Sequence, residues 1–435
     1  MKPLAIIGLV STGLLALSAC GHDAARSGRV QVTVWSGWTG EEAKSFQRLC
    51  DRFNAEHPGI HVDNLGGVTD NTKVIRAITA GVPPDAFTIW SAPDVGPLAG
   101  YGALCTLDEE FRASGLKESD FVPSALEMCR YRGKLIGVPL LMDTLAFLWN
   151  KDAFVEAGLD PEHPPRTLEE MKKLAARLTV RNADGDIERL GMMLPDTTLL
   201  TYAFGGGYLD AKTGAVTANR AENVQALTFY ADLVRSMGGR GKVAAFGSGF
   251  GQGQGPNHPF FVGKVAMMVN GEWIPSWIER YSPSLQYGVA PIPYHRGRED
   301  RAGTTTISVN MLGIPREAKH PKEAWQFLAW LQRPDVQTEF AQALNNVPNI
   351  RASLSEPDLT SGTERKLNFG KFCRYAMHPN AVGFPNTPIG HLYLTELGAA
   401  TDFVLFGKKT PQQALDDVQR KVSSEMKRME KSIRG

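Results

Sequence analysis

The order of apolar and polar positions in the first third of the chain predicts strands and helices in alternation. Short β-rich runs cover residues 30–35, 60–65 and 86–90. Between them, apolar side chains recur at helical spacing over residues 43–53 and again around 72–80. A strand, helix, strand, helix, strand order predicts a parallel α/β sheet.

Capping residues mark the expected helix ends. Thr39 with Glu42 three residues later predicts a capped helix start in the first third of the chain. Near the C-terminus, Thr410 and Gln413 form the same pattern around Pro411, and apolar residues then recur every three or four positions. This pattern predicts an amphipathic helix packed on a lobe, because its polar face mixes both charges instead of being basic like a membrane-surface helix.

A short apolar segment opens the chain. Lys2 precedes an apolar run over residues 4–17, which is typical of a secretory signal and shorter than a membrane span. The tetrapeptide over residues 17–20 resembles the processing box of bacterial lipoproteins, in which the final cysteine receives acyl chains. We therefore expect residues 1–19 to be a signal peptide and 20–29 a tether with its lipid on Cys20, facing the periplasm or the cell exterior. Ordinary cleavage beside an incidental cysteine is the alternative.

Composition limits the classes of partner. The 435 residues carry 47 basic and 46 acidic side chains, so there is almost no net charge to attract nucleic acid or anionic lipid broadly. We expect no nucleic-acid partner. The chain without its leader is long enough for two or three lobes with buried cores.

Four cysteines follow Cys20: Cys50, Cys105, Cys129 and Cys373. An even number in an exported protein permits three pairings, of which a disulfide between Cys105 and Cys129 is preferred, with free buried thiols as the alternative. Neither a C-x-x-C motif nor a nearby histidine pair accompanies them, so no metal site is expected, and no cofactor.

Two tryptophans stand at the carboxyl ends of predicted strands. Trp35 and Trp90 are followed by Gly37-Trp38 and by Pro93-Asp94. Ligands of open α/β sheets collect beyond these strand ends, so the two rings predict a shared crevice. Packing in the core is the alternative for either ring. Trp149, Trp325 and Trp330 lie within apolar periodic runs and are predicted to be core residues.

A series of motifs resembles the extracellular solute-binding proteins of bacterial ABC importers, the family that includes the maltose-binding protein. Residues 133–152 read GKLIGVPLLMDTLAFLWNKD, and Gly206-Gly207-Tyr208 follows in the family's order. Residues 261–267, then Asn270-Gly271-Glu272-Trp273, and finally residues 287–291 and 324–328 continue it. The ordered set is more specific than any one piece.

The resemblance implies a fold and a division of the chain. The fold is α/β with two lobes, of the periplasmic-binding-protein type II, and each lobe has a mostly parallel sheet flanked by helices. The hinge consists of three crossovers, expected near residues 139–144, 287–293 and 345–351. We expect the N-lobe to comprise residues 30–140 and 292–347, and the C-lobe to comprise residues 141–291 and 348–435.

The resemblance also implies ligand-binding residues, which lie in both lobes and at the hinge: Trp35, Trp38, Trp90, Asp94, Asp143, Tyr202, Gly206 and Trp273. Gly37 lacks the polar side chain that binds ligand in the maltose-binding protein. Asp143 can instead cap the hinge, and Glu272 can simply face solvent. Arg351 at the third crossover can hold a phosphate or carboxylate, although a surface salt bridge is the commoner role.

The implied function is capture of a mono- or oligosaccharide, or another polyol, between closing lobes and its delivery to the membrane subunits of an ABC permease. We expect a monomeric binding protein without catalytic residues. A sugar phosphate or glycerol-phosphate compound is the alternative ligand. An extracellular glycosidase with paired carboxylates and a lipoprotein scaffold for protein partners are the competing classes.

Overall fold

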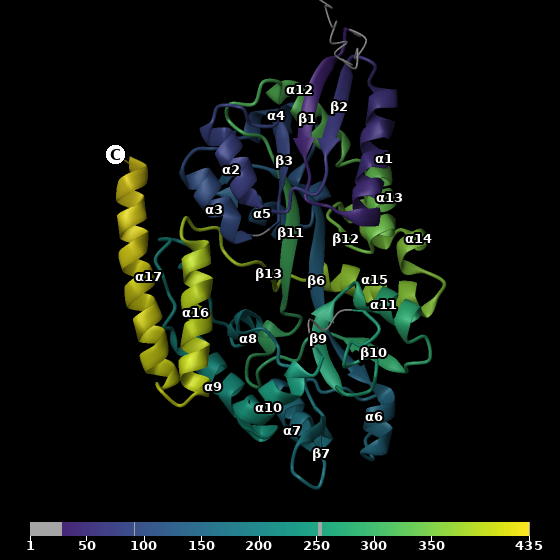
Figure 1. Ribbon diagram of the computed structural model, residues 1–435, viewed down its shortest axis with the longest axis vertical. Coiled ribbons are helices and arrows are strands. Elements are labelled where there is room, and N and C mark those ends of the chain that lie inside the picture. Colours follow the sequence, from purple (N-terminus) through teal and green to yellow (C-terminus); the bar gives the residue numbers. More distant parts are fainter. Residues whose placement is uncertain (1–27, 91, 251–254, 435) are drawn as a thin grey trace, which may run out of the picture.

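The computed structural model describes residues 28–90, 92–250 and 255–434. The predicted signal peptide, Cys20 and the tether up to residue 27 lie outside the described residues. The described chain is an α/β protein in which an upper and a lower lobe meet along one long strand (Figure 1).

The main sheet has nine strands, six of which follow the order β10-β6-β11-β3-β1-β2, while β9 and β12 pair with β6 and β13 pairs with β11. The bounds of these strands are β1 (Val30–Trp35), β2 (Ile60–Leu65), β3 (Ala86–Ile89), β6 (Val138–Asn150), β9 (Met267–Gly271), β10 (Tyr287–Ala290), β11 (Thr305–Gly313), β12 (Val347–Pro348) and β13 (Ala381–Val382). Two hairpins pair β4 (Arg130–Tyr131) with β5 (Lys134–Leu135) and β7 (Val180–Arg181) with β8 (Ile187–Arg189).

Helices surround both halves of this sheet (Figure 1). In the upper half they are α1 (Gly40–Glu56), α2 (Asn71–Thr79), α3 (Ala92–Gly100), α4 (Asp108–Ala113), α5 (Pro123–Met128), α12 (Pro321–Trp330) and α13 (Pro334–Leu344). In the lower half they are α6 (Lys151–Glu156), α7 (Leu168–Leu178), α8 (Thr197–Ala203), α9 (Ala221–Ser236), α10 (Gly239–Ser248) and α11 (Ile274–Tyr281). The remaining α-helices are α14 (Pro357–Thr360), α15 (Glu364–Ala376), α16 (Gly390–Leu405) and α17 (Pro411–Arg434), and short 3-10 turns are η1 (Glu118–Asp120), η2 (Glu299–Arg301) and η3 (Arg351–Ser355).

The predicted N-terminal pattern is confirmed in its main elements. β1 pairs in parallel with β2 and with β3, and α1 and α2 connect these strands. The third strand ends at Ile89, just before Trp90. Thr39 precedes α1, but its side chain makes no capping hydrogen bond, so the predicted capping box is wrong there. Around Thr410 the box is confirmed, because Thr410 and Gln413 each accept a backbone hydrogen bond from the other.

Strand β6 belongs to both lobes. Its first half pairs with β11 and β12, and its second half pairs with β9 and β10. Residues 292–304 still contact the lower lobe, since the amide of Leu168 donates to Tyr294 and the guanidinium of Arg298 donates to the carbonyl of Phe204. These residues, which the prediction lists in the N-lobe, thus contact elements of the lower lobe, and the division of the chain into lobes stays a prediction.

The C-terminal hairpin of α16 and α17 lies along both lobes (Figure 1). On the upper lobe His391 contacts Asp94, with 2.5 Å between Nε2 and Oδ1. On the lower lobe Arg240 pairs with Asp402 at 3.2 Å. The predicted amphipathic helix is confirmed in α17, whose Leu415, Val418 and Val422 are buried.

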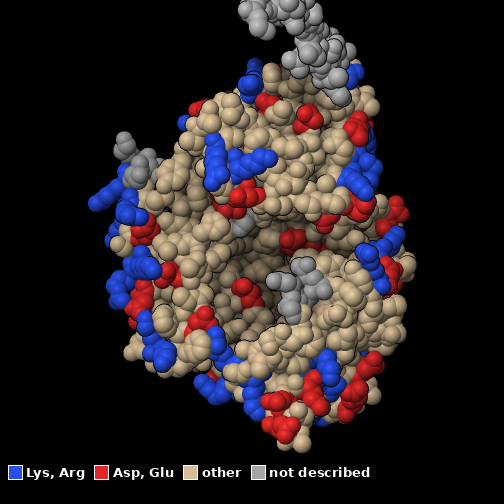
Figure 2. Space-filling model, in the orientation of Figure 1, with Lys and Arg blue, Asp and Glu red and all other residues tan. Residues whose placement is uncertain are grey.

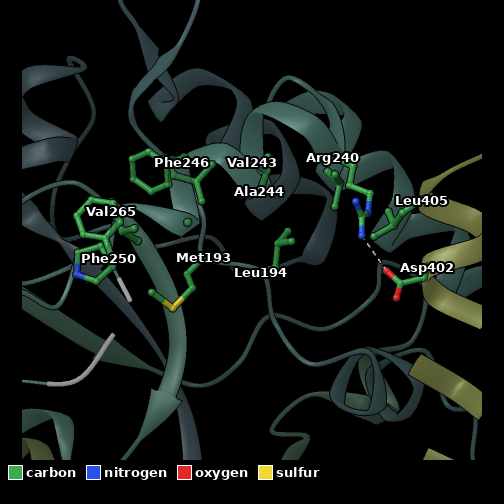
Figure 3. Close-up of a pocket in the computed structure, with 14 residues that line it drawn as sticks. Met193, Leu194, Arg240, Val243, Ala244, Phe246, Phe250, Val265, Asp402 and Leu405 are labelled. Carbon is green, nitrogen blue, oxygen red and sulfur yellow. Dashed lines mark hydrogen bonds and ion pairs between the residues drawn. The ribbon is translucent and has the colours of Figure 1, made fainter. Parts of the chain in front are cut away.

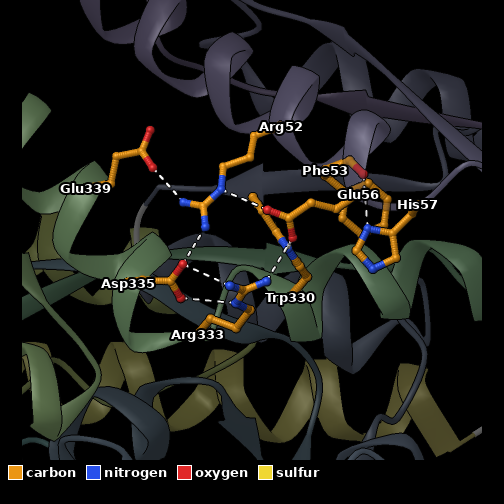
Figure 4. Close-up of polar contacts among 8 residues, drawn as sticks. All are labelled: Arg52, Phe53, Glu56, His57, Trp330, Arg333, Asp335 and Glu339. Carbon is orange, nitrogen blue, oxygen red and sulfur yellow. Dashed lines mark hydrogen bonds and ion pairs between the residues drawn. The ribbon is translucent and has the colours of Figure 1, made fainter.

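Polar contacts tie α12 and α13 to α1 (Figure 4). Glu56 accepts from the Trp330 indole at 2.7 Å and from Arg333 at 2.8 Å, and Arg52 reaches Glu339 at 2.8 Å. Trp330, Trp149 and Trp325 are at most 6% exposed, which confirms them as core residues.

The predicted disulfide between Cys105 and Cys129 is wrong, because all four described cysteines are free thiols. Cys129 is fully buried at the end of α5, where burial raises its thiol pKa well above the usual value. The Cys105 sulfur instead donates to the Pro315 carbonyl at 3.5 Å. Within the described residues, no helix is both long and apolar enough to cross a membrane.

Asn349 connects the strands at the hinge. Its buried side-chain amide donates to the carbonyl oxygens of Pro139 and Leu140, at 3.0 and 2.8 Å, and to Gln337 Oε1 at 3.0 Å. The substitution Asn349→Ala removes all of these side-chain hydrogen bonds from a buried place, so we expect the free energy of unfolding to fall by about 2–3 kcal/mol. Urea denaturation measures this, with Gln342→Ala on the exposed face of α13 as the control. Equal midpoints for the two variants would contradict the role of Asn349.

Candidate functional site

The molecule is hollowed between its upper and lower parts (Figure 2). Where β6 and β11 pass between the lobes, partly exposed side chains alternate with buried ones. Asp143 and Leu145 on β6, and Thr306 and Ser308 on β11, are the partly exposed members of this alternation. Since side chains in a strand alternate between two faces, these four residues share one face and form the floor of the cleft.

Two carboxyl groups meet at this floor. Asp143 accepts a hydrogen bond from the Ser308 hydroxyl at 2.8 Å, and Glu272 accepts one from the Thr144 amide at 2.9 Å. The side-chain amide of Asn346 donates to both groups, at 2.9 Å to Asp143 and 2.8 Å to Glu272. Glu272 is fully buried, so the expectation that it faces solvent is wrong.

Burial sets the protonation of this carboxyl pair. Desolvation, and then the charge of Asp143, holds the pKa of Glu272 well above its usual value. Burial also raises the pKa of Asp143, although hydrogen bonds from Ser308 and Glu272 oppose that shift. Burial and the repulsion between two adjacent carboxylates thus both favour the form of the pair that shares a proton. Glu42 in the first turn of α1 also has a raised pKa, through burial and then Asp143.

Trp273 follows Glu272 directly and opens α11. Its half-buried ring lies over Gly271, where an added Cβ would come within 2.1 Å of a ring carbon. The glycine therefore lets the indole lie flat across the end of β9. Trp277 is the aromatic neighbour, at 6.4 Å between ring centroids.

Three tryptophans of the upper lobe take different places. Trp35 and Trp90 are half-buried at the ends of β1 and β3, and the Lys73 ammonium lies 5.1 Å from the Trp35 ring centroid. Trp38 is only 2% exposed and packs edge-on against Trp90, at 5.1 Å between centroids. Trp38 therefore supports Trp90 from the core instead of lining the cleft. Gly37 is required, because an added Cβ would lie 1.9 Å from the Trp90 nitrogen.

Asp94 and Arg351 make contacts outside the carboxyl pair. Asp94 accepts from the Asn71 amide at 2.7 Å and contacts His391, so it links α3 to α2 and α16. Arg351 is exposed and donates to the Ser119 carbonyl at 3.4 Å. In the structure these two residues thus have structural partners.

Tyr202 and Gly206 line a separate polar compartment of about 640 Å³. The Tyr202 hydroxyl donates to the Gly383 carbonyl at 3.2 Å. Gly206 packs so closely on Asn223 that an added Cβ would lie 2.1 Å from the amide oxygen. The structure thus brings Asp143 and Trp273 to one part of the site, and Tyr202 and Gly206 to another.

A third cavity, of about 420 Å³, is mostly apolar and lies in the lower lobe (Figure 3). Met193, Leu194, Val243 and Phe246 line it, with the ion pair of Arg240 and Asp402 at one side. Such walls leave hydroxyl groups without partners and do not suit a polar ligand.

The sequence prediction missed Glu272, Ser308 and Asn346 as members of the site. Glu272 had a signal, its place beside Trp273, but burial decides its role and could not be deduced from that motif. Ser308 and Asn346 come from other segments and reach Asp143 only through the pairing of β6 with β11 and β12. Across the described ranges, no group of three or more His, Cys, Asp or Glu side chains could hold a metal ion.

Comparison with known proteins shows what the chain resembles. The sequence profile of the family described as bacterial extracellular solute-binding protein matches residues 37–338. The maltotriose-binding protein of Pyrococcus abyssi is 24% identical over 343 residues, which cover 77% of this chain and 70% of the relative. The sn-glycerol-3-phosphate-binding periplasmic protein UgpB of Escherichia coli K12 is 25% identical over 439 residues, which cover 93% of this chain and 94% of the relative.

Solved structures agree with the profile. CpMnBP1 with mannobiose bound has a TM-score of 0.76 and 27% identity, and the match covers 90% of this chain and 99% of that chain. The sugar-binding protein MalE of Xanthomonas citri also has a TM-score of 0.76, at 21% identity, with 92% of this chain and 98% of that chain covered. The likeness to MalE shows that this chain has the same fold.

The raised pKa of Glu272 predicts a pH-dependent stability. A raised pKa in the folded state stabilises the fold fully below the unfolded pKa of about 4.3, and this stabilisation is lost as the pH rises through the folded pKa. Glu272→Gln keeps the shape but cannot ionise. We therefore expect the variant to become more stable relative to the wild type as the pH rises above about 5.

Thermal unfolding across this pH range measures the effect. The exposed Glu317→Gln is the control, and its difference from the wild type should not follow this trend. A constant difference between wild type and Glu272→Gln would show that the carboxyl pair is not protonated in the folded protein.

Proposed function

The chain belongs to the bacterial extracellular solute-binding proteins, and we propose that it captures a carbohydrate between its lobes for delivery to an ABC importer. Members of this family are binding receptors of ABC transporters, not enzymes. The named relatives bind maltotriose, mannobiose and mannotriose, which supports a sugar as the solute.

The proposal rests on an aromatic ring and a pair of carboxyl groups that neighbour each other in the cleft. The half-buried ring of Trp273 lies next to the carboxyl pair of Asp143 and Glu272, with Ser308 and Asn346 beside them. Aromatic faces pack on the C–H faces of a sugar ring, while hydroxyl, amide and carboxyl groups exchange hydrogen bonds with its hydroxyls. This combination suits a polyol ring that packs one face on the Trp273 ring and forms hydrogen bonds with the polar groups through the hydroxyls at its edge.

The same geometry argues against a glycosidase. Catalytic carboxyl groups of glycosidases flank the scissile bond and are held about 5–9.5 Å apart. Here one side-chain amide, that of Asn346, donates to both Asp143 and Glu272, so the two groups cannot stand on opposite sides of a ligand bond. The pair can hold a ligand but lacks the geometry for hydrolysis.

Closure of the lobes would complete binding. β6 crosses between the lobes, so a small rotation about its middle brings Trp35 and Trp90 of the upper lobe toward Trp273. A ligand that contacts both lobes binds the closed form better, and that difference shifts the population toward closure. In this proposal the protein is a monomer whose closed form docks on the permease, with residues 348–435 moving with the C-lobe.

A glycerol phosphate or sugar phosphate is the second candidate ligand, because relatives such as UgpB bind sn-glycerol-3-phosphate. Arg351 is exposed and donates one long hydrogen bond, of 3.4 Å, to the Ser119 carbonyl, so its other N–H groups stay available for a phosphate.

We expect mannobiose or maltotriose to raise the unfolding temperature and to make the protein more compact in small-angle scattering. A ligand present at a concentration one hundred times its dissociation constant raises the free energy of unfolding by about 2.7 kcal/mol. Trp273→Ala should remove most of this effect, whereas Phe406→Ala, an exposed ring at the end of α16, should not. Turnover of an oligosaccharide would contradict the binding role, and full binding by Trp273→Ala would contradict this site.

The lipid anchor is a separate part of the proposal, supported by the leader and Cys20. We expect the wild-type chain to fractionate with membranes and to carry acyl chains on Cys20. Cys20→Ser should release the protein or leave its leader uncleaved, and Cys105→Ser should leave fractionation unchanged. Mass spectrometry of the N-terminal peptide checks this, and an unmodified cysteine in membrane-bound protein would contradict it.

A further inference from the structure

We propose that the ligand carries an anionic group, a carboxylate or a phosphate ester, and that Arg301 and Lys212 bind it. This inference rests on the proposed function and adds the charge of the solute. The site is the polar compartment of about 640 Å³ beside the start of β11, which we call the basic compartment. Its ionisable lining residues are Asp210, Lys212, Arg220 and Arg301.

The charges of this lining do not balance. Asp210 accepts hydrogen bonds from the amides of Lys212 and Thr213, at 3.1 and 2.9 Å, and pairs with Arg220 at 3.2 Å. Asp210 therefore neutralises Arg220 and has little capacity left. Among the described residues, no carboxylate lies within ion-pair distance of Lys212. The basic compartment thus has positive charge in excess.

Arg301 adds to this excess. Its only described ion-pair partner is Asp300, with 3.0 Å between Nε and Oδ2. The same carboxylate also pairs with Arg298, at 3.0 Å between Nε and Oδ1. Two guanidinium groups share one carboxylate, so one positive charge remains. The Arg301 side chain lines the basic compartment and is 39% exposed, and since its Nε is buried, this exposure belongs to the outer part of the guanidinium.

The loop that carries Arg301 is held in place. The Asn380 side chain donates to the carbonyls of Asp300 and Ala302, at 2.8 and 2.9 Å. Arg298 donates to the Phe204 carbonyl at 2.8 Å, which fixes the loop to α8. A guanidinium on a fixed loop loses little freedom when it binds, and its fork of donors matches a carboxylate or phosphate.

The basic compartment and the sugar site lie along the same strand. Thr304, just before β11, lines the compartment, and Ser308, four residues later, donates to Asp143. Four strand residues span about 13 Å, so a ligand of disaccharide length can reach both places. The carboxyl pair would repel an anion, whereas Arg301 and Lys212 attract it. A ligand with hydroxyls at one end and a negative charge at the other fits this order.

Calorimetric titration of the purified protein with matched pairs tests the proposal. The pairs are digalacturonate and galactobiose, mannose 6-phosphate and mannose, and sn-glycerol 3-phosphate and glycerol. We expect at least one anionic member to bind about tenfold tighter than its neutral partner, with the advantage reduced in high salt. The pair that responds distinguishes a carboxylate from a phosphate.

Variants identify the residue whose charge is responsible for tighter binding of the anionic compound. Arg301→Gln should weaken the anionic member about tenfold and leave the neutral one unchanged, and Arg301→Lys should recover part of the loss. Arg296→Gln, an exposed arginine of the same loop, is the control. Unchanged unfolding temperatures show that the variants are folded.

Two results would overturn the inference while the proposed function stands. Neutral sugars, including mannobiose or maltotriose, could bind while no anionic member has an advantage, or Arg301→Gln could weaken both members of a pair equally. Failure of every neutral and anionic compound to bind would instead count against the carbohydrate function itself.

Discussion

The hydrogen-bonded carboxyl pair joins every strand that passes between the lobes. Asp143 lies on β6, Ser308 on β11, and Asn346 immediately before β12, while Glu272 directly follows the lower-lobe strand β9. A buried pair of acids is stable only with a shared proton and a donor for each remaining oxygen. Because each donor comes from a different segment, the pair requires all of them in register. The same proton that satisfies the fold keeps the cleft floor from carrying two negative charges.

Strand β6 explains why the pair lies where it does. The strand changes its pairing partner at its middle. Thr144 pairs with Ile307 of β11, and the next residue, Leu145, pairs with Gly271 at the end of β9. A strand shared by both lobes cannot twist independently in each half, so in the proposed closure the rotation between the lobes would be concentrated at its middle. Groups placed there would shift little, whereas Trp90 and Trp273, on either side, would move by more. In this proposal the floor is the fixed part of the cleft, and the aromatic rings are the moving part.

Periodicity was enough to predict β1, β2, α1 and α17, because the local spacing of apolar residues determines them, and the box of Thr410 and Gln413 also marks the start of α17. It could not place Trp38, since the same strand-end position is compatible with a core residue until Phe46 and Phe340 are known to enclose it. The boundary at 291/292 has no local signal for a related reason: residues 292–304 form no long strand or helix, and their contacts with α7 and with Phe204 at the end of α8 involve distant segments. Contacts between distant segments, such as Asn346 with Glu272, have no local signature.

The C-terminal hairpin limits how the lobes can move. Tyr393, Leu397, Leu415 and Val418 form one apolar cluster with Tyr208 and Val216 of the lower lobe. Contacts of the hairpin with the upper lobe include polar ones at partly exposed side chains, such as His391 with Asp94 and Arg132 with Glu430. Apolar burial contributes more than exposed ion pairs, which are worth about 0–1 kcal/mol each. In the proposed closure the hairpin therefore follows the lower lobe, and its exposed polar contacts with the upper lobe would exchange at little cost. The close packing of Gly390 on Pro93 of α3 limits how far the hairpin can leave the upper lobe.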